Sequence, residues 1–168
     1  MNFKKTLTAF VIIGIVGTLC HFVYKWSGES KIVGMLAPVN ESIFEHQKLI
    51  FFPSVLYFAI EYLCCCRDIK NYIPASVLGI FSGIGFVVTF FYLYSGILGY
   101  SVDTVNVLLY FAGVAVMLIV RNILIKNDAF SSETAKRVAI VSVLITAVLF
   151  MVWTAYPPKI SFFIPEAE

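Results

Sequence analysis

The chain has 168 residues, 60% of them hydrophobic and 13% charged, and its formal net charge is only +2. A soluble domain averages about 45–50% apolar residues, and a small one leaves much of its surface exposed to water. The low charge argues against a nucleic-acid partner, because phosphate binding needs a dense basic face. Length and composition therefore predict one domain, residues 1–168, whose main partner is a lipid bilayer.

Apolar stretches of about 20 residues, the length that crosses a bilayer as a helix, recur along the chain. They predict an all-α bundle with about five transmembrane spans. The first stretch follows Lys4 and Lys5 but has no small-x-small cleavage site, which favours a retained helix over a signal peptide. The expected spans are residues 6–24, 42–66, 74–98, 104–125 and 138–156.

The basic residues are distributed unevenly between the two sides of the predicted bundle. Alternation of the spans puts eight Lys and Arg on the side of the N-terminus and four on the other. The side richer in Lys and Arg is usually cytoplasmic, so we expect a multi-pass cell-membrane protein with its N-terminus inside and its C-terminus outside. The eight are Lys4, Lys5, Arg67, Lys70, Arg121, Lys126, Lys136 and Arg137, and the four are Lys25, Lys31, Lys48 and Lys159.

Two outer segments contain apolar residues that would avoid water. Residues 25–41 have an apolar middle, so we expect this segment at the membrane interface. Residues 157–168 begin with two prolines, which end the last span. We expect this tail to fold back over the outer face.

The third span contains Gly79 and Gly83, four residues apart. Small residues at this spacing let two helices approach closely. We therefore expect close helix packing on this face, and a homo-oligomer formed through it is one interpretation.

Ionisable residues crowd together where the second span begins. Glu41 and Glu45 are four residues apart and Lys48 follows, which would place all three on one helix face. His46 would point about 100° away from Glu45, and His21 is expected at a similar depth on the first span. Imidazoles and carboxylates together suit zinc, iron or manganese.

A site at this position has two predicted functions. The metal-ligand candidates are His21, Glu41, Glu45 and His46. A metal-bound water or a glutamate of raised pKa would serve hydrolysis or proton transfer. The catalytic candidates are Glu41, Glu45, His46 and Lys48.

The same residues also have a structural interpretation. Ser42 and Glu45 have the spacing of a capping box, and Asn40 is another capping candidate. A carboxylate such as Glu41 is favoured near a helix N-terminus. Glu45 and Lys48 can pair on a helix surface. By these arguments the residues would fix only the start of the helix.

Other polar residues are expected to support the site or extend it. Asp103 and Asn106, at the start of the fourth span, are expected beside it. Tyr57 and Glu61 lie farther along the second span, toward the inner side. We expect Glu61 to form a buried ion pair with Arg67 or Lys70, and a proton relay is the alternative.

Three sequence features together carry a family likeness: the pattern P-V-N-E-S-x-x-E-H-x-K at residues 38–48, His21-Phe22, and Pro157-Pro158-x-Ile160. With them, the chain resembles a family of small uncharacterised bacterial membrane proteins. Ser161 and the run Ile164-Pro165-Glu166 depart from the pattern of that family's tail. The resemblance implies no activity, but it supports treating residues 40–48 and His21 as one unit.

Three classes of function stay open. The first is a metal-dependent or acid–base enzyme that acts on a lipid-like or small substrate. The second is a transporter or channel subunit that binds its substrate in the same pocket. The third is a structural or accessory protein without chemistry. The enzyme needs polar groups that converge on one point, whereas the transporter needs a polar lining that continues past the midplane through Tyr57 and Glu61.

Overall fold

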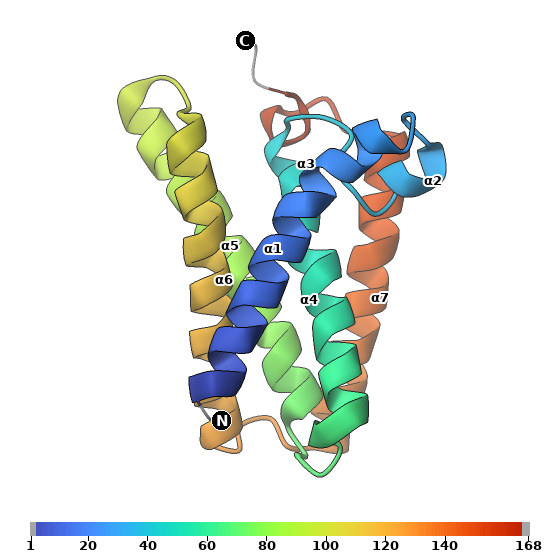
Figure 1. Cartoon of the computed structure of the whole chain (residues 1–168), viewed down its shortest axis with the longest axis vertical. Helices are drawn as coiled ribbons and strands as arrows, with labels where there is room; N and C mark the ends of the chain where they lie inside the picture. Colours follow the sequence, from blue (N-terminus) through green and yellow to red (C-terminus); the bar gives the residue numbers. More distant parts are fainter. Residues whose placement is uncertain (1–2, 166–168) are drawn as a thin grey trace.

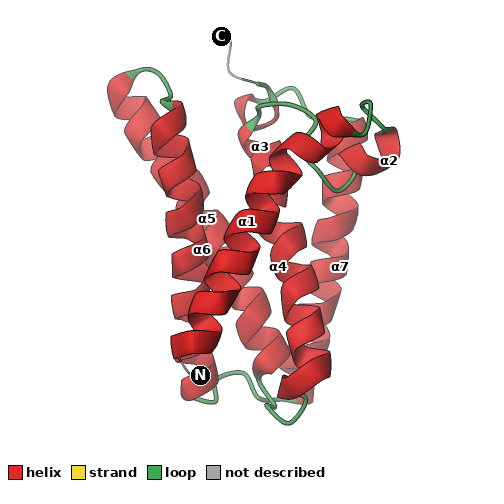
Figure 2. Ribbon diagram, viewed as in Figure 1, coloured by secondary structure: helices red, strands yellow, loops and turns green. Residues whose placement is uncertain are grey.

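The computed structural model describes residues 3–165, which form helices and connecting loops without a β-strand (Figure 2). Within this part of the chain, five helices are long and apolar enough to cross a membrane, which confirms the predicted fold class. They are Phe3–Trp26, Ile43–Cys66, Tyr72–Leu98, Asp103–Lys126 and Glu133–Ala155. Residues 1–2 and 166–168, with the predicted departure at Glu166, lie outside the described residues.

The second of these long helices is built from three consecutive pieces, and two short helices lie outside the five. Figure 1 shows that α2, α3 and η2 gather at one end of the bundle, the α3 end, while the start of α1 lies at the opposite end, the η1 end. The elements are α1 (Phe3–Trp26), α2 (Lys31–Gly34), α3 (Ile43–His46), α4 (Lys48–Glu61), the π-helix η1 (Tyr62–Cys66), α5 (Tyr72–Leu98), α6 (Asp103–Lys126), α7 (Glu133–Ala155) and the 3-10 helix η2 (Ser161–Phe163).

The two glycines of the third span bring α5 against α6. A Cβ atom on Gly79 would lie 2.7 Å from the carbonyl oxygen of Met117, and one on Gly83 would lie 2.7 Å from that of Gly113. The predicted close packing therefore occurs within one chain. The face that we expected to join two copies is filled by α6, because the small residues let the two backbones touch.

A second close approach holds α1 against α4. Pro53 has no N–H, so the carbonyl of Leu49, four residues earlier, lacks its helical donor. Gly17 faces this carbonyl, and a Cβ there would lie 2.5 Å from the Leu49 oxygen and 2.0 Å from the Tyr110 hydroxyl. His21 is one helical turn beyond Gly17, so this contact directs His21 toward the α3 end of the second span.

An aromatic cluster closes the α3 end of the bundle. Phe44 of α3 has its ring centroid 4.5 Å from that of Phe163 in η2 and 5.0 Å from that of Phe150 in α7. The rings of Trp153 and Phe162 lie at 5.8 and 5.9 Å. These contacts tie the end of the described tail and α7 to the short helix that carries His46.

The outer faces of the helices are apolar. On α7, Leu144, Ile145 and Val148 are more than half exposed, at 61%, 55% and 55%. Contiguous exposed apolar surface of this kind is unfavourable in water and compatible with contact with lipid.

Candidate metal centre

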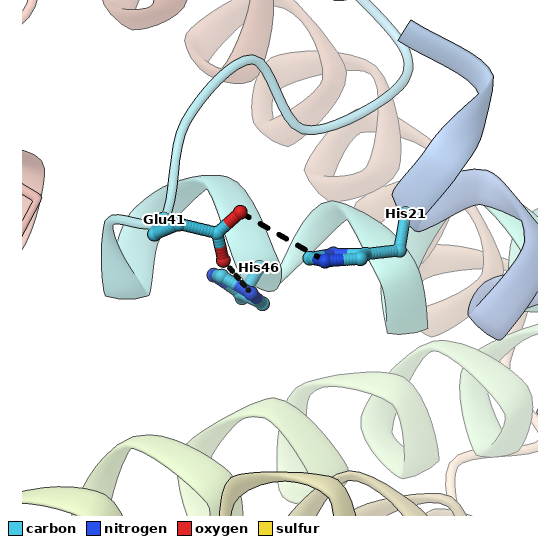
Figure 3. Close-up of side chains that lie close together, drawn as sticks. All are labelled: His21, Glu41 and His46. Atoms are coloured by element: carbon cyan, nitrogen blue, oxygen red, sulfur yellow. Dashed lines mark ion pairs between the residues drawn. The ribbon is translucent and has the colours of Figure 1, made fainter. Parts of the chain in front are cut away.

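Three separate segments bring two imidazoles and one carboxylate together at the α3 end. His21 comes from α1, Glu41 from the loop before α3, and His46 from α3, and Figure 3 shows the three side chains converging. Glu41 Oε2 lies 3.2 Å from His46 Nε2, and Glu41 Oε1 lies 3.8 Å from His21 Nε2. One ligand atom from each residue lies within 4.8 Å of the other two.

Hydrogen bonds fix the loop on both sides of Glu41. Before it, the Val39 N–H donates to Glu45 Oε2 at 3.0 Å. After it, the Ser42 N–H donates to Asn40 Oδ1 at 2.9 Å, and Ser42 Oγ accepts from the Glu45 N–H at 3.3 Å. Ser42 is therefore the N-cap of α3. Asn40 serves the N–H that a capping-box glutamate would have reached.

The position of this cap corrects one expectation. Glu41 precedes Ser42 and so lies outside the helix, which begins at Ile43. The i,i+4 rule that would have paired Glu41 with Glu45 applies only within a helix. The loop turns Glu41 toward His46 instead, while Glu45 points into the bundle.

The hydrogen bond of His46 with its own helix defines its tautomer. His46 Nδ1 lies 2.9 Å from the Ser42 carbonyl oxygen. A carbonyl can only accept, so Nδ1 carries a proton and Nε2 faces Glu41. Two lone pairs repel each other, so the contact between Nε2 and the carboxylate is favourable only with a proton or a metal ion between them. A backbone carbonyl on the second ring nitrogen is the usual support of a metal-binding histidine.

Positive charge surrounds the Glu41 carboxylate. The hydrogen bond with His46 lowers the pKa of Glu41, and the charges of His46, His21 and Lys25 act in the same direction, against the opposing effect of burial. Lys25 is one turn beyond His21 on α1. The Glu41 side chain is 60% exposed, and those of His21 and His46 are 31% and 33% exposed. The carboxylate is therefore ionised near neutral pH and open to solutes.

These distances are close to those that a small divalent ion requires. A tetrahedral zinc ion with ligands at 2.0–2.1 Å separates them by about 3.3 Å. The contact between Glu41 and His46, at 3.2 Å, already has this length, and the contact between Glu41 and His21, at 3.8 Å, is longer by about half an ångström. Two histidines and one carboxylate also match the ligand set of catalytic zinc and of non-haem iron, both of which leave open positions.

Glu45 and Lys48 belong to a different, buried network. Lys48 Nζ lies 2.6 Å from Glu45 Oε2 and 2.6 Å from Thr154 Oγ1, and it donates to the Gly34 carbonyl at 2.8 Å. Glu45 Oε1 lies 2.7 Å from Thr154 Oγ1. The two charged side chains are 3% and 0% exposed, so this is not the surface pair that the sequence suggested. The network anchors the segment of α2, through Gly34, to α4 and α7.

Glu61 also has a partner other than the expected ones. Its carboxylate lies 2.6 Å from the Arg121 guanidinium, and it accepts a hydrogen bond from the Tyr72 hydroxyl. The predicted pairing with Arg67 or Lys70 is therefore wrong. Arg121, which we placed at the membrane surface, is completely buried in α6. A charged residue close to an apolar run of about 17 residues was the available signal for this pair.

The remaining sequence candidates lie elsewhere. Tyr57 and Glu61 both line a cavity near the η1 end, and Glu61 lies 15 residues, or about 22 Å, along the helix from His46. Asn106 accepts a hydrogen bond from Tyr94. Asp103 is in the first turn of α6, and Figure 1 shows this end of the α5–α6 pair apart from α3. Thr154, which the sequence analysis missed, is one polar residue near the end of an apolar helix and carries no spacing signal.

The chain belongs to the family of unknown function DUF6512, whose model matches residues 2–168. No curated protein and no solved structure matches the chain.

Proposed function

We propose that this chain is a multi-pass membrane protein that holds one divalent transition-metal ion on His21, Glu41 and His46 and uses it to activate water. The convergence of these three ligand atoms from three segments is the observation that carries the proposal. We further propose that the N-terminus is cytoplasmic and that the metal lies at the outer face, following the distribution of Lys and Arg.

The ligand set supports hydrolysis rather than a purely structural metal. A structural zinc site uses four protein ligands, whereas three protein ligands leave a position for water. A bound metal ion lowers the pKa of that water toward neutrality and so supplies a nucleophile. His21, Glu41 and His46 would hold the ion, and the Ser42 carbonyl would keep His46 in the required tautomer.

The place of the site indicates the kind of substrate. Phe22 and Trp26 stack at 5.7 Å beside His21 and are 45% and 67% exposed, as expected for side chains at the membrane interface. Lys25 lies on the same part of α1 and its charge reaches Glu41. We propose a lipid-like substrate with an anionic group near the scissile bond.

The sequence candidates Glu45 and Lys48 then have a supporting role. Their charges are consumed by each other and by Thr154, which favours a structural function over catalysis. The transporter alternative has less support because Glu61, the next polar group toward the η1 end, is held by Arg121 and Tyr72.

The test is the metal content of detergent-purified, tag-free protein after supply of zinc, iron or manganese. We expect one equivalent of metal in the wild type and its loss in His21→Ala, Glu41→Ala and His46→Ala. Glu29→Gln is the matched control, because Glu29 is an exposed carboxylate in the turn after α1 and outside the triad. A folded wild type that takes up none of the three metals would overturn the proposal.

Activity separates the enzyme from a metal-binding protein without chemistry. We expect hydrolysis of micellar fluorogenic esters or phosphoesters that a chelator abolishes and the metal restores. Equal, chelator-insensitive rates in the wild type and His46→Ala would leave the metal site but remove the enzyme.

A further inference from the structure

A second polar feature, independent of the metal centre, lies at the η1 end. A cavity of about 340 Å³ is bounded by the start of α1 and the end of the second span. Its lining residues are Lys4, Lys5, Thr8, Tyr57, Ile60, Glu61 and Cys65. The volume is in the range of small-molecule sites, about 300–1,000 Å³.

The cavity combines a cationic rim with apolar walls. Lys4 and Lys5 are exposed in the first turn of α1, and Ile60, exposed by 53%, faces outward from α4. The one carboxylate that lines the cavity, that of Glu61, is neutralised by Arg121 at 2.6 Å. The charge that the cavity offers to a ligand is therefore positive.

The π-helix η1 holds one of these cations in place. Cys65 Sγ lies 3.9 Å from Lys5 Nζ and 3.5 Å from the Glu61 carbonyl. Single π-turns inside helices are frequent at functional sites. Within residues 3–165 the ammonium of Lys5 forms no ion pair with a carboxylate, so its charge is available to a ligand.

We propose that this cavity binds one anionic phospholipid, with the headgroup phosphate at Lys4 and Lys5 and an acyl chain along Tyr57 and Ile60. Basic residues at the end of a membrane helix lie at headgroup level, where they attract acidic lipids. The apolar lining below them suits a hydrocarbon chain and is unfavourable for a soluble anion. Charge complementarity and depth thus select a lipid over free phosphate.

The test compares phosphatidylglycerol with phosphatidylcholine, added to the full chain in neutral detergent and counted by native mass spectrometry. We expect one phosphatidylglycerol per chain and clear preference over phosphatidylcholine. Lys5→Gln should weaken the affinity about fivefold, the value of one cation near an anionic headgroup, and Lys5→Arg should retain it. Lys126→Gln is the matched control, because Lys126 is an exposed cation in the last turn of α6, outside the cavity.

A third variant tests the acyl chain separately from the charge. Ile60→Trp fills the cavity without changing its charge, so it should abolish the binding of phosphatidylglycerol. Glycerol phosphate, which has the headgroup chemistry without the chains, should not displace the lipid. Equal affinity for the two lipids, equal losses in Lys5→Gln and Lys126→Gln, unchanged binding in Ile60→Trp, or displacement by glycerol phosphate would each overturn the inference. The metal content plays no part in this outcome.

Discussion

His46 Nε2 lies 3.2 Å from Glu41 Oε2, while the other nitrogen of the same ring is held by the Ser42 carbonyl at 2.9 Å. This arrangement leaves Nε2 with two possible occupants, a proton or a metal ion. A proton gives an ion pair, and a metal ion gives the first two bonds of a coordination shell. The two occupants exclude each other, so acidity and metal binding are linked.

Metal affinity should therefore fall in acid. Ordinary histidines take up protons below about pH 6.5, and each displaced proton weakens binding by up to about tenfold per pH unit below that value. The pKa of Glu41 is lowered from its usual value, so its own contribution is fully present above about pH 4.3 and is lost only as the pH falls further. Cobalt titrations at pH 5.5, 6.5 and 7.5 check this. An affinity that does not change with pH would contradict proton–metal exchange at His46.

The cap of α3 should affect the metal centre as well as stability. Ser42→Ala removes the acceptor of the Glu45 N–H and should cost about 1 kcal/mol of unfolding free energy. It also loosens the loop that holds Glu41, so metal affinity should fall. Ser132→Ala is the matched control, because Ser132 caps α7 through the Ala135 N–H. SDS unfolding and cobalt titration of both variants separate the two effects, and equal cobalt affinities would show that the cap does not position Glu41.

Sequence reasoning predicted the spans because an apolar run of about 20 residues is a local signal that needs no partner. It also placed His21 and His46 at similar depth, since depth follows from counting residues along two spans. The ring centroids of these histidines lie 5.3 Å apart.

The partners of the buried charges could not be predicted in the same way. Whether Glu41 or Glu45 faced His46 depended on where the helix began, and helix ends are uncertain by one or two residues. Arg121 and Thr154 reach Glu61 and Glu45 from helices 60 and 109 residues away in sequence. Periodicity describes one helix at a time, so it does not specify which helices pair.

The buried pair of Glu45 and Lys48 should be costly to break on one side only. Lys48→Met leaves the Glu45 carboxylate buried without its cation and should lower the unfolding free energy by about 3–5 kcal/mol. The double variant Glu45→Gln, Lys48→Met should recover part of that loss. The exposed pair of Glu133 and Lys136 is the control, since Lys136→Met should cost about 0–1 kcal/mol. Similar losses for Lys48→Met and Lys136→Met in SDS unfolding would be inconsistent with a buried ion pair.

The contact of α1 with α4 should tolerate no side chain at Gly17. Gly17→Ala places a Cβ against the Leu49 carbonyl and the Tyr110 hydroxyl, so it should destabilise the bundle and move His21 away from His46. In Gly85→Ala the new Cβ meets no atom within 4 Å, and the loss of helical glycine should stabilise the chain by about 0.5–1 kcal/mol. Thermal unfolding and cobalt binding of the two variants provide the check. The same sign of change in both would show that α1 and α4 are not packed through Gly17.

Lys25 should act on the substrate and not on the metal. It lies one turn beyond His21, and its charge reaches the Glu41 carboxylate without an ion pair to it. Lys25→Met should therefore keep one cobalt ion per chain while it weakens the binding of inorganic phosphate to the cobalt-loaded protein about fivefold, the value of one exposed charge. Lys31→Met removes an exposed cation from α2 at the same end and serves as the control. The phosphate-dependent change in the visible spectrum of cobalt measures both. Equal phosphate affinity in the wild type and Lys25→Met would exclude Lys25 from anion recognition and leave the metal centre intact, whereas loss of cobalt in Lys25→Met would place Lys25 among the residues that hold the ion.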